Sequence, residues 1–282
     1  MEEQNEIAFN RQYLAELEEW RRHMDESLRS ELSWLALAGL FWLQDGPNTI
    51  GSDPASDVAL PQRKAPLHVG VLHKEAQGVW MEPAPGVDVR VNGEPCERRL
   101  LRDDTQPTVD QVSIGSITFV VLQRGARVGI RVWDRTNPRR QSFEGRRWYE
   151  PQAAFRVAGR FERHDPPGTI DIPNVLGDVE ARENPGAVAF TIDGRALRLE
   201  GVASGERSLF IIFRDQTSGN ETYGVGRFLY LKINDDDTVE VDFNRAYNPP
   251  CAFTEYATCP MPPRANHLPV AIRAGELDTG HH

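Results

Sequence analysis

The chain has 282 residues, of which 39% are apolar and 26% are charged, and its formal net charge is −10 at pH 7. This length allows two modest domains with separate cores, and the composition is typical of a folded globular protein rather than a disordered one. The acidic balance argues against a nucleic-acid binder and against attachment to anionic membranes, because both functions need a basic surface.

The amino-terminal sequence has no basic stretch followed by an apolar core, so we expect no secretory signal. The longest apolar run, LSWLALAGLFWL at 32–43, has about half of the ~20 residues that a membrane-spanning helix needs, and we interpret it as buried core. Three cysteines in such a chain favour reduced thiols and a cytoplasmic location. Residues 280–282 (Gly-His-His) resemble the start of a purification tag and are left out of the site predictions.

An apolar stripe at three- and four-residue steps runs through residues 5–30, at Phe9, Tyr13, Leu17, Trp20 and Met24. This spacing predicts an amphipathic helix, and a packing face is a more common use of such a stripe than a partner-binding face. We therefore predict a helical first region, 1–34.

Short apolar segments separated by Gly, Pro and Asp follow, which predicts an all-β sandwich at 35–135. The segments are NTIGS, DVALP, HVGVL, GVWME, VDVRV, VSIGSITFVVL and VGIRVW. Residues 134–185 then show weak periodicity and many Pro, Arg and Asp residues. We place a packed domain junction here, because Phe143, Trp148, Tyr149 and Phe155 are too apolar for a free linker.

A second β region is predicted from the segments AVAFTI, ALRLEGV, SLFIIFRD, GRFLYLKI and TVEVDFNRA. The second β domain is assigned to 136–282, so the predicted fold class is mainly β with an amino-terminal helix (α+β overall). The last two segments read as a hairpin whose apolar residues share one face if Ile233 pairs with Val239, Leu231 with Val241 and Leu229 with Phe243. That register puts Asp242 and Asn244 on the other face of the hairpin. Arg227 then lies on the opposite face from Asp242, so the register disfavours an Arg227–Asp242 pair.

The most irregular part of the chain is 242–270, with six prolines, three asparagines, two cysteines and a histidine. Its polar side chains either satisfy the backbone of an irregular segment or converge on a small-ligand pocket at the mouth of the β fold. We hypothesise that the carboxy-terminal domain binds a small polar molecule. The candidate ligand-binding residues are Arg227, Tyr230, Asp242, Asn244, Tyr247, Asn248, Cys251, Asn266 and His267.

Cys251, Cys259 and His267 follow a C-x7-C-x7-H pattern, whereas structural zinc sites usually show short Cys-x2–4-Cys spacings and a fourth ligand. Buried thiols are the better interpretation, so we expect no metal. No P-loop, Rossmann, HExxH, EF-hand or Gly-x-Ser-x-Gly pattern occurs, and we expect no cofactor. A hydrolase with a site around Asp242 and Cys251, and a protein-interaction scaffold that uses the sandwich, stay open as alternatives.

Residues 50–119 contain, in this order, the strings IGSDPASDVALP, APLHVG, VDVRVNG and VSIGSITF. These strings resemble a forkhead-associated domain, a β-sandwich that binds phosphothreonine, with His68 and Asn92-Gly93 at the positions of the family's His and Asn-Gly. Ser52, Ala65 and Pro66 stand where the family has Arg, Ser and Arg, so the charge-assisted phosphate donors are lost. The resemblance thus implies the sandwich fold without phosphopeptide binding.

Three longer strings are also distinctive: GLFWLQDGPNTIGSDP, FRDQTSGNETYGVGRFL and DFNRAYNPPCAFTEYATCPMPPRANHLPVAIRAGE. With these strings nearly the whole chain resembles the bacterial domain-of-unknown-function 1684 family. This resemblance implies an amino-terminal helix, a sandwich of the forkhead-associated kind and a carboxy-terminal β region, and it brings no activity with it.

We predict that the sandwich does not bind phosphothreonine, because Ser52, Ala65 and Pro66 replace the family's phosphate ligands. The measurement is a titration of the full chain with a phosphothreonine peptide library, with the unphosphorylated peptides as the control. Micromolar binding that depends on the phosphate would contradict the prediction.

Overall fold

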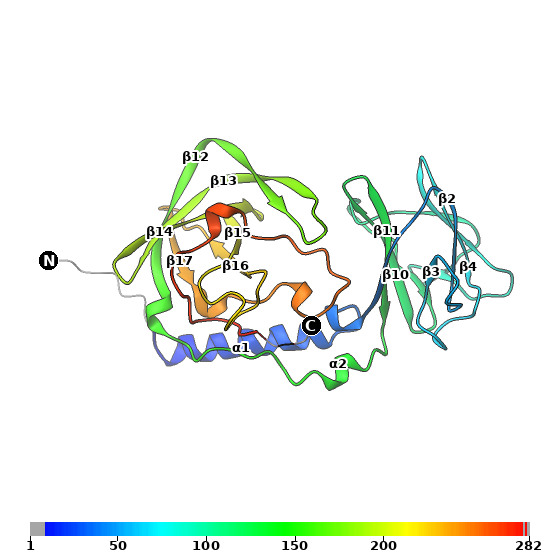
Figure 1. Cartoon of the computed structure of the whole chain (residues 1–282), viewed down its shortest axis with the longest axis horizontal. Helices are drawn as coiled ribbons and strands as arrows, with labels where there is room; N and C mark the ends of the chain where they lie inside the picture. Colours follow the sequence, from blue (N-terminus) through cyan, green and yellow to red (C-terminus); the bar gives the residue numbers. More distant parts are fainter. Residues whose placement is uncertain (1–8, 279, 281–282) are drawn as a thin grey trace. The chain divides into compact units, whose positions relative to one another are not determined.

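The structure is a computed structural model that describes residues 9–278 and 280. It consists of two compact units: unit 1 comprises Met1–Asp25 and Gly145–His282, and unit 2 comprises Glu26–Glu144. The helix and the strands confirm the predicted fold class, which is mainly β with an amino-terminal helix (Figure 1). The sequence analysis placed boundaries after residues 34 and 135, whereas the contacts in the structure divide the chain after residues 25 and 144.

Unit 2 is built from two sheets, of six and five strands, with the orders β1-β11-β10-β9-β6-β7 and β3-β2-β4-β5-β8. Only β2 and β3 pair in parallel; the other ladders among the described residues of this unit are antiparallel. The strands are β1 (Leu37–Trp42), β2 (Gly46–Gly51), β3 (Val58–Ala59), β4 (Gly70–Glu75), β5 (Gly78–Pro83), β6 (Arg90–Val91), β7 (Glu94–Pro95), β8 (Arg99–Leu101), β9 (Val112–Ile114), β10 (Ile117–Arg124) and β11 (Arg127–Asp134), with η1 (Trp34–Ala36) and α2 (Arg139–Ser142) outside the sheets.

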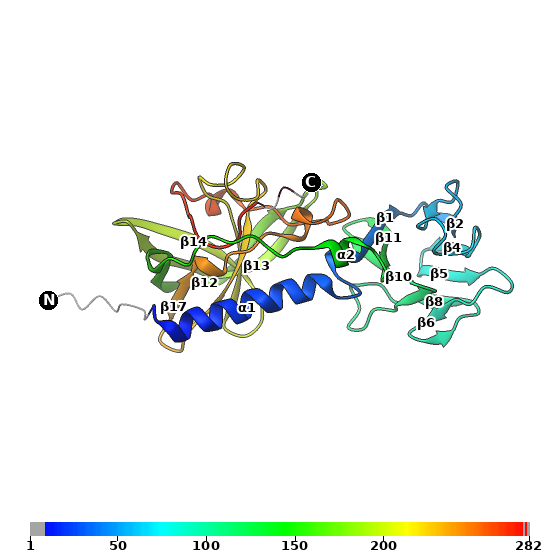
Figure 2. The ribbon, with the colours of Figure 1, turned by 90° about the horizontal axis from the view of Figure 1, so that it is seen from below.

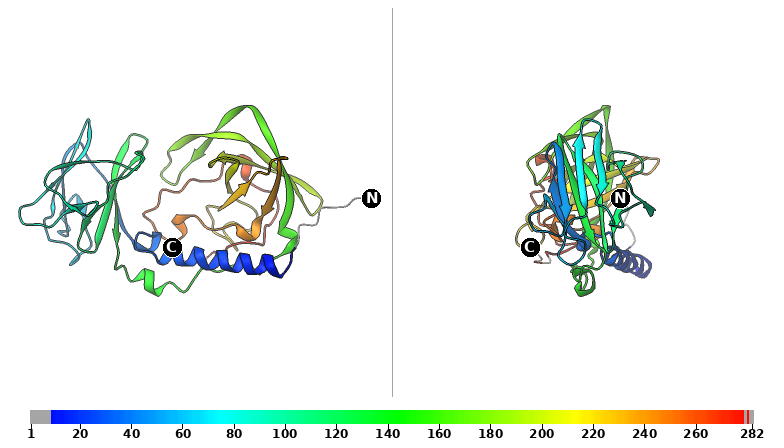
Figure 3. Two further views of the ribbon diagram at one scale, coloured as in Figure 1. Left: turned by 180° about the vertical axis from the view of Figure 1, so that it is seen from behind. Right: turned by 90° about the vertical axis from the view of Figure 1, so that its right-hand side faces the viewer.

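The two sheets of unit 2 face each other (Figure 3), and residues of both sheets form its apolar core. Ile50 and Leu72 from one sheet pack with Phe119 and Val132 from the other, as alternating strands with one buried face require. The apolar run at 32–43 contains η1 and β1; its residues Leu35 and Leu37 are buried, as interpreted from the sequence, whereas Leu32 is exposed.

Unit 1 contains a six-stranded antiparallel sheet with the order β16-β15-β14-β13-β12-β17. Its elements are α1 (Arg11–Arg29), whose residues up to Asp25 belong to this unit, β12 (Arg156–Pro173), β13 (Val179–Ile192), β14 (Arg195–Ala203), β15 (Ser208–Phe213), β16 (Arg227–Lys232) and β17 (Thr238–Asp242), with η2 (Ala153–Phe155), η3 (Phe243–Arg245), η4 (Pro250–Ala252) and η5 (Arg264–Asn266). The edge strands β16 and β17 meet at an Ile233–Val239 bridge, so the sheet curls into a barrel.

The barrel corrects the hairpin register that the sequence analysis assumed. Ile233 does face Val239, but beyond that bridge β16 pairs with β15 and β17 pairs with β12. Leu231 therefore faces Leu209, and Val241 faces Val157, so the predicted Leu231–Val241 and Leu229–Phe243 pairs do not form. The two strands diverge because each completes the barrel with a different neighbour.

Strands β12 and β13 extend beyond the barrel as a long two-stranded arm (Figure 1). All of β12 and the first half of β13 fall in the region 134–185, which was interpreted as a domain junction. That interpretation is wrong for 156–173 and 179–185. The arm is exposed on most of both faces, and in β12 only Phe161 and Ile172 are buried, so little apolar alternation marks it in the sequence.

The apolar core of unit 1 fills the inside of the barrel, and a smaller cluster lies outside it. The inner cluster includes Phe190, Leu199 and Ile211. The outer cluster joins Ile172 of the arm to Ile212 and Phe228 of the barrel wall, so the arm packs against the barrel.

Helix α1 lies along the outside of the barrel, as Figure 2 shows, and it begins at Arg11, while residues 5–8 of the predicted helix lie outside the described residues. Tyr13 and Leu17 of its apolar stripe are buried. The Tyr13 hydroxyl lies 3.1 and 3.0 Å from the two carboxylate oxygens of Asp242, and the Arg156 guanidinium lies over the Tyr13 ring at 4.0 Å. Among the described residues, no helix is long and apolar enough to cross a membrane.

We predict that Tyr13→Phe lowers the free energy of unfolding by about 1–3 kcal/mol, because it removes a hydrogen bond to a buried carboxylate. Urea unfolding followed by circular dichroism measures the loss. Gln12→Ala, at an exposed position of the same helix, is the control and should change stability by less than about 0.5 kcal/mol. Equal stability of the two variants would show that the Tyr13–Asp242 contact does not hold the helix.

Candidate functional site

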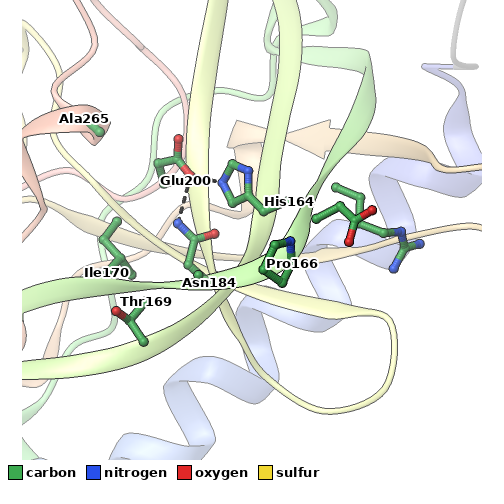
Figure 4. Close-up of a pocket in the computed structure, with 10 residues that line it drawn as sticks. His164, Pro166, Thr169, Ile170, Asn184, Glu200 and Ala265 are labelled. Atoms are coloured by element: carbon green, nitrogen blue, oxygen red, sulfur yellow. Dashed lines mark hydrogen bonds and ion pairs between the residues drawn. The ribbon is translucent and has the colours of Figure 1, made fainter.

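An open pocket lies where the β12–β13 arm leaves the barrel. The ladder between the two strands is irregular there. Arg163 and Gly168 of β12 are five positions apart, whereas their partners in β13, Gly186 and Asn184, are only two positions apart. The extra residues of β12 bend away from the sheet, as in a β-bulge. The pocket has a volume of about 620 Å³ and is lined by Arg163, His164, Asp165, Pro166, Gly168, Thr169, Ile170, Asn184, Glu200 and Ala265 (Figure 4).

Glu200 of β14 is at the centre of the polar groups in this pocket. Its Oε2 accepts a hydrogen bond from Asn184 Nδ2 at 2.9 Å and lies 3.1 Å from His164 Nε2, as Figure 4 shows. Arg198 forms an ion pair with its other carboxylate oxygen. Burial raises the pKa of Glu200, but the hydrogen bonds from Asn184 and His164 and the charge of Arg198 outweigh burial and hold the pKa below its usual value. Glu200 is therefore ionised at neutral pH.

Asn184 and His164 approach Glu200 from the two strands of the arm. Asn184 is buried, and its Oδ1 accepts a hydrogen bond from the Gly186 backbone at 2.9 Å, which fixes the orientation of the amide. The His164 side chain is 32% exposed, so one side of the imidazole faces solvent in the pocket. A carboxylate that binds one ring nitrogen fixes the orientation of the ring.

Asn266, one of the residues predicted from the sequence, forms hydrogen bonds with the backbone of Glu200. Its Oδ1 accepts from the Glu200 N–H at 2.7 Å, and its Nδ2 donates to the carbonyls of Glu200 and Ile212, each at 2.9 Å. These bonds attach η5 to the barrel wall and bring Ala265 to the rim of the pocket. The proline-rich segment thus lines this pocket through Ala265, whereas the sequence predicts that it lines a pocket at Asp242.

Asp242 and Asn244 are brought together beneath α1 rather than in this pocket. Asn244 donates from Nδ2 and from its backbone N–H to Asp242 Oδ1, at 3.0 and 3.1 Å. Burial raises the pKa of Asp242, against the hydrogen bonds from Asn244 and Tyr13 and the charge of Arg245. The two residues share one network that contacts the helix, and Asn244 lies in η3 rather than on the strand face that the sequence predicts for both residues.

Arg227 pairs with Asp215, at 2.8 Å from Nη2 to Oδ2, and both side chains are fully buried. It also donates to the carbonyls of Ala274 and Ile272. Asp215 accepts from the hydroxyl and the backbone N–H of Thr217. This pair is a buried junction between the barrel and the carboxy-terminal segment, and Asp242 is not part of it.

Asn248 belongs to a third network, with Glu276 and Arg146. Glu276 Oε2 accepts from Arg146 Nη1 at 2.6 Å and from the Asn248 N–H at 2.8 Å. Complete burial raises the pKa of Glu276 to about 7, although Arg146 and the Asn248 N–H favour the charged form. Gly275 has a φ of 81°, and a Cβ on it would lie 2.5 Å from the Ala246 carbonyl, so glycine is required beside Glu276.

The remaining predicted residues lie apart from these networks. Tyr247 and Tyr230 are hydrogen-bonded partners; burial raises the pKa of Tyr247, and Tyr230 is 55% exposed. Cys251 contacts Cys259, and His267 is exposed with its backbone bridged to Arg214. Within residues 9–278 and 280, no group of three or more His, Cys, Asp or Glu side chains is arranged to hold a metal ion.

Sequence reasoning missed His164, Asn184 and Glu200. His164 and Asn184 are 36 and 16 positions from Glu200 in the sequence, and the three residues meet because β12, β13 and β14 are neighbours in the barrel. One signal was present: the string HDPPG at 164–168 puts a histidine beside two prolines and a glycine, a combination that interrupts a strand.

The match to a known family covers the barrel and the pocket. Residues 141–277 match the model of a family described as "Protein of unknown function (DUF1684)", which supports the family resemblance for this part of the chain. An uncharacterized protein of Haloarcula marismortui, solved in solution by NMR, is 31% identical; the match covers 51% of this chain and 82% of that chain, with a TM-score of 0.43. No curated protein matches the chain.

The raised pKa of Glu276 predicts a stability that changes with pH. The folded state binds this proton more tightly than the unfolded state, so the stabilisation is present below the ordinary pKa and is lost as the pH rises through about 7. Between pH 5 and pH 8 the free energy of unfolding of the parent protein should fall by up to about 3 kcal/mol more than that of Glu276→Gln. Urea unfolding at both pH values measures the difference, with the exposed Glu255→Gln as the control. Parallel pH profiles of the parent and Glu276→Gln would contradict the prediction.

Proposed function

We propose that unit 1 binds a small polar molecule in the pocket around Glu200 and His164. The observation that carries this proposal is an ionised carboxylate, oriented by a buried amide and an imidazole, at the edge of an open pocket of about 620 Å³. Small-ligand sites combine such oriented polar groups with a concave surface.

The ligand class follows from the groups that the pocket presents. Glu200 supplies acceptor oxygens, His164 supplies a ring nitrogen other than the one near Glu200, and Thr169 supplies a hydroxyl. Ile170 adds an apolar surface on the arm. A polar molecule with both donors and acceptors, such as a hydroxylated or amino-substituted metabolite, complements this lining.

The residues first predicted for ligand binding are engaged with other parts of the chain. Asp242 binds Tyr13 and Asn244, whereas Cys251 contacts Cys259, so the two residues of the alternative hydrolase site belong to separate networks. Those contacts favour the Glu200 pocket over a site around Asp242.

We also propose that the whole chain is a member of the bacterial family with unknown function 1684, and that unit 2 is a forkhead-associated-like sandwich. Two sheets around one core support the second point, as does the Asn92-Gly93 turn, in which both residues have positive φ. Ser52 Oγ donates to the Ala65 carbonyl, so this hydroxyl serves the loop itself. The reduced cysteines favour a cytoplasmic location.

Ligand-observed NMR against a panel of amino acids, sugars, nucleosides and carboxylic acids tests the pocket. We expect Glu200→Gln and His164→Gln each to weaken binding of the selected compound at least tenfold, about 1.4 kcal/mol. The matched control is Glu240→Gln, the same change at a glutamate of β17 that forms an ion pair with Arg156 of β12. Native mass spectrometry of protein from its source identifies any bound molecule independently.

Two results would contradict the proposed site. One is a bound compound whose affinity is the same in Glu200→Gln, His164→Gln and the parent. The other is a compound that is lost in Asp242→Asn but kept in both pocket variants, which would move the site to the region beneath α1.

A further inference from the structure

Two thiols of the proline-rich segment are in direct contact. The Cys251 N–H donates to Cys259 Sγ at 3.0 Å. Because an N–Cα bond is about 1.5 Å long, that sulfur lies at most about 4.5 Å from the Cα of Cys251. The two thiols also form a hydrogen bond with each other. The two sulfur atoms are therefore near neighbours, as the formation of a disulfide requires.

The two cysteines differ in their exposure to solvent. Cys251 follows Pro250 at the start of η4 and is half-buried, whereas Cys259 is only 3% exposed. A small oxidant from solution reaches Cys251 first, and the buried Cys259 is then the neighbouring thiol. This is the arrangement of an attacking and a resolving cysteine.

Cys251 is also the better nucleophile of the chain's half-buried thiols. Hydrogen bonds from the Cys259 thiol and the Tyr223 hydroxyl lower the pKa of Cys251, against the effect of burial. Cys96 of unit 2 is half-buried too, but burial raises its pKa. Since the thiolate is the reactive form, an oxidant should distinguish Cys251 from Cys96.

We propose that Cys251 and Cys259 form a reversible disulfide in response to peroxides, by way of a sulfenic acid on Cys251. The Cys251 thiolate attacks one oxygen of hydrogen peroxide, breaks the O–O bond and releases hydroxide. The Cys259 thiolate then attacks the Cys251 sulfur and expels the second oxygen as hydroxide. Two thiols and one peroxide thus give one disulfide and two waters, and a low-molecular-weight thiol reverses the change.

The disulfide would form at the attachment of the β12–β13 arm. The Cys259 carbonyl accepts from the Val175 N–H at 3.0 Å, and the Met261 N–H donates to the Pro173 carbonyl at 2.7 Å. These bonds hold the arm tip to the segment that contains the cysteines. Transient disulfides of this kind are the usual form in a reducing cytoplasm.

Oxidation of the full reduced chain by a few equivalents of hydrogen peroxide tests the proposal. Arg245 and Arg264 flank both cysteines, so trypsin releases them in one peptide, residues 246–264. We expect this peptide to lose roughly 2 Da, the mass of two hydrogens, and to regain it with dithiothreitol. Cys96→Ser, the matched control, should oxidise at the parent rate.

Two single variants separate the roles of the thiols. Cys259→Ser should accumulate a sulfenic acid at Cys251 that dimedone traps, and Cys251→Ser should slow oxidation of the same peptide at least tenfold. Thermal melts establish that both variants are folded. Trapping mainly at Cys96 or Cys259, or a parent peptide that keeps its mass while peroxide is consumed, would overturn the proposal.

Discussion

The buried ion pair between Arg227 and Asp215 is the contact on which the arrangement of unit 1 depends. A guanidinium with no exposed surface is tolerated only when its charge is paired and hydrogen-bond acceptors lie beside it. Asp215 neutralises the charge, and the carbonyls of Ile272 and Ala274 accept further hydrogen bonds. The carboxy-terminal segment is therefore held against the barrel by the requirement to satisfy one buried cation.

Most polar groups of the carboxy-terminal region serve the same purpose of pairing buried groups. Prolines remove backbone donors, so the segment cannot continue the sheet, and side-chain amides make the attachments instead. Asn266 bonds the barrel wall in this way, and Asn248 bonds the Leu277 carbonyl. Glu200 and His164 differ, because they are paired to each other and still line an open pocket. That contrast distinguishes the candidate site from the structural networks.

The sequence predicts those features that depend on residues close together along the chain. Val239 and Val241 alternate with polar residues, so their strand was visible, whereas the arm has too few buried side chains to show its period. Asn266 was visible as an isolated amide among prolines. The Glu200–His164 contact was not, because it depends on the order of strands in the barrel rather than on spacing along the chain. The hairpin register was right at Ile233–Val239 and wrong beyond it for the same reason.

Unit 1 is assembled from two stretches of chain that are separated by the whole of unit 2. During synthesis the ribosome makes helix α1 first, then the sandwich, and only afterwards the barrel that covers Tyr13 and Leu17. At ordinary translation speeds the intervening residues take on the order of ten seconds. Throughout that interval the apolar stripe of the helix has no barrel to pack on. The nascent chain therefore carries an uncovered apolar helix until the barrel is made, a state that the finished fold does not show.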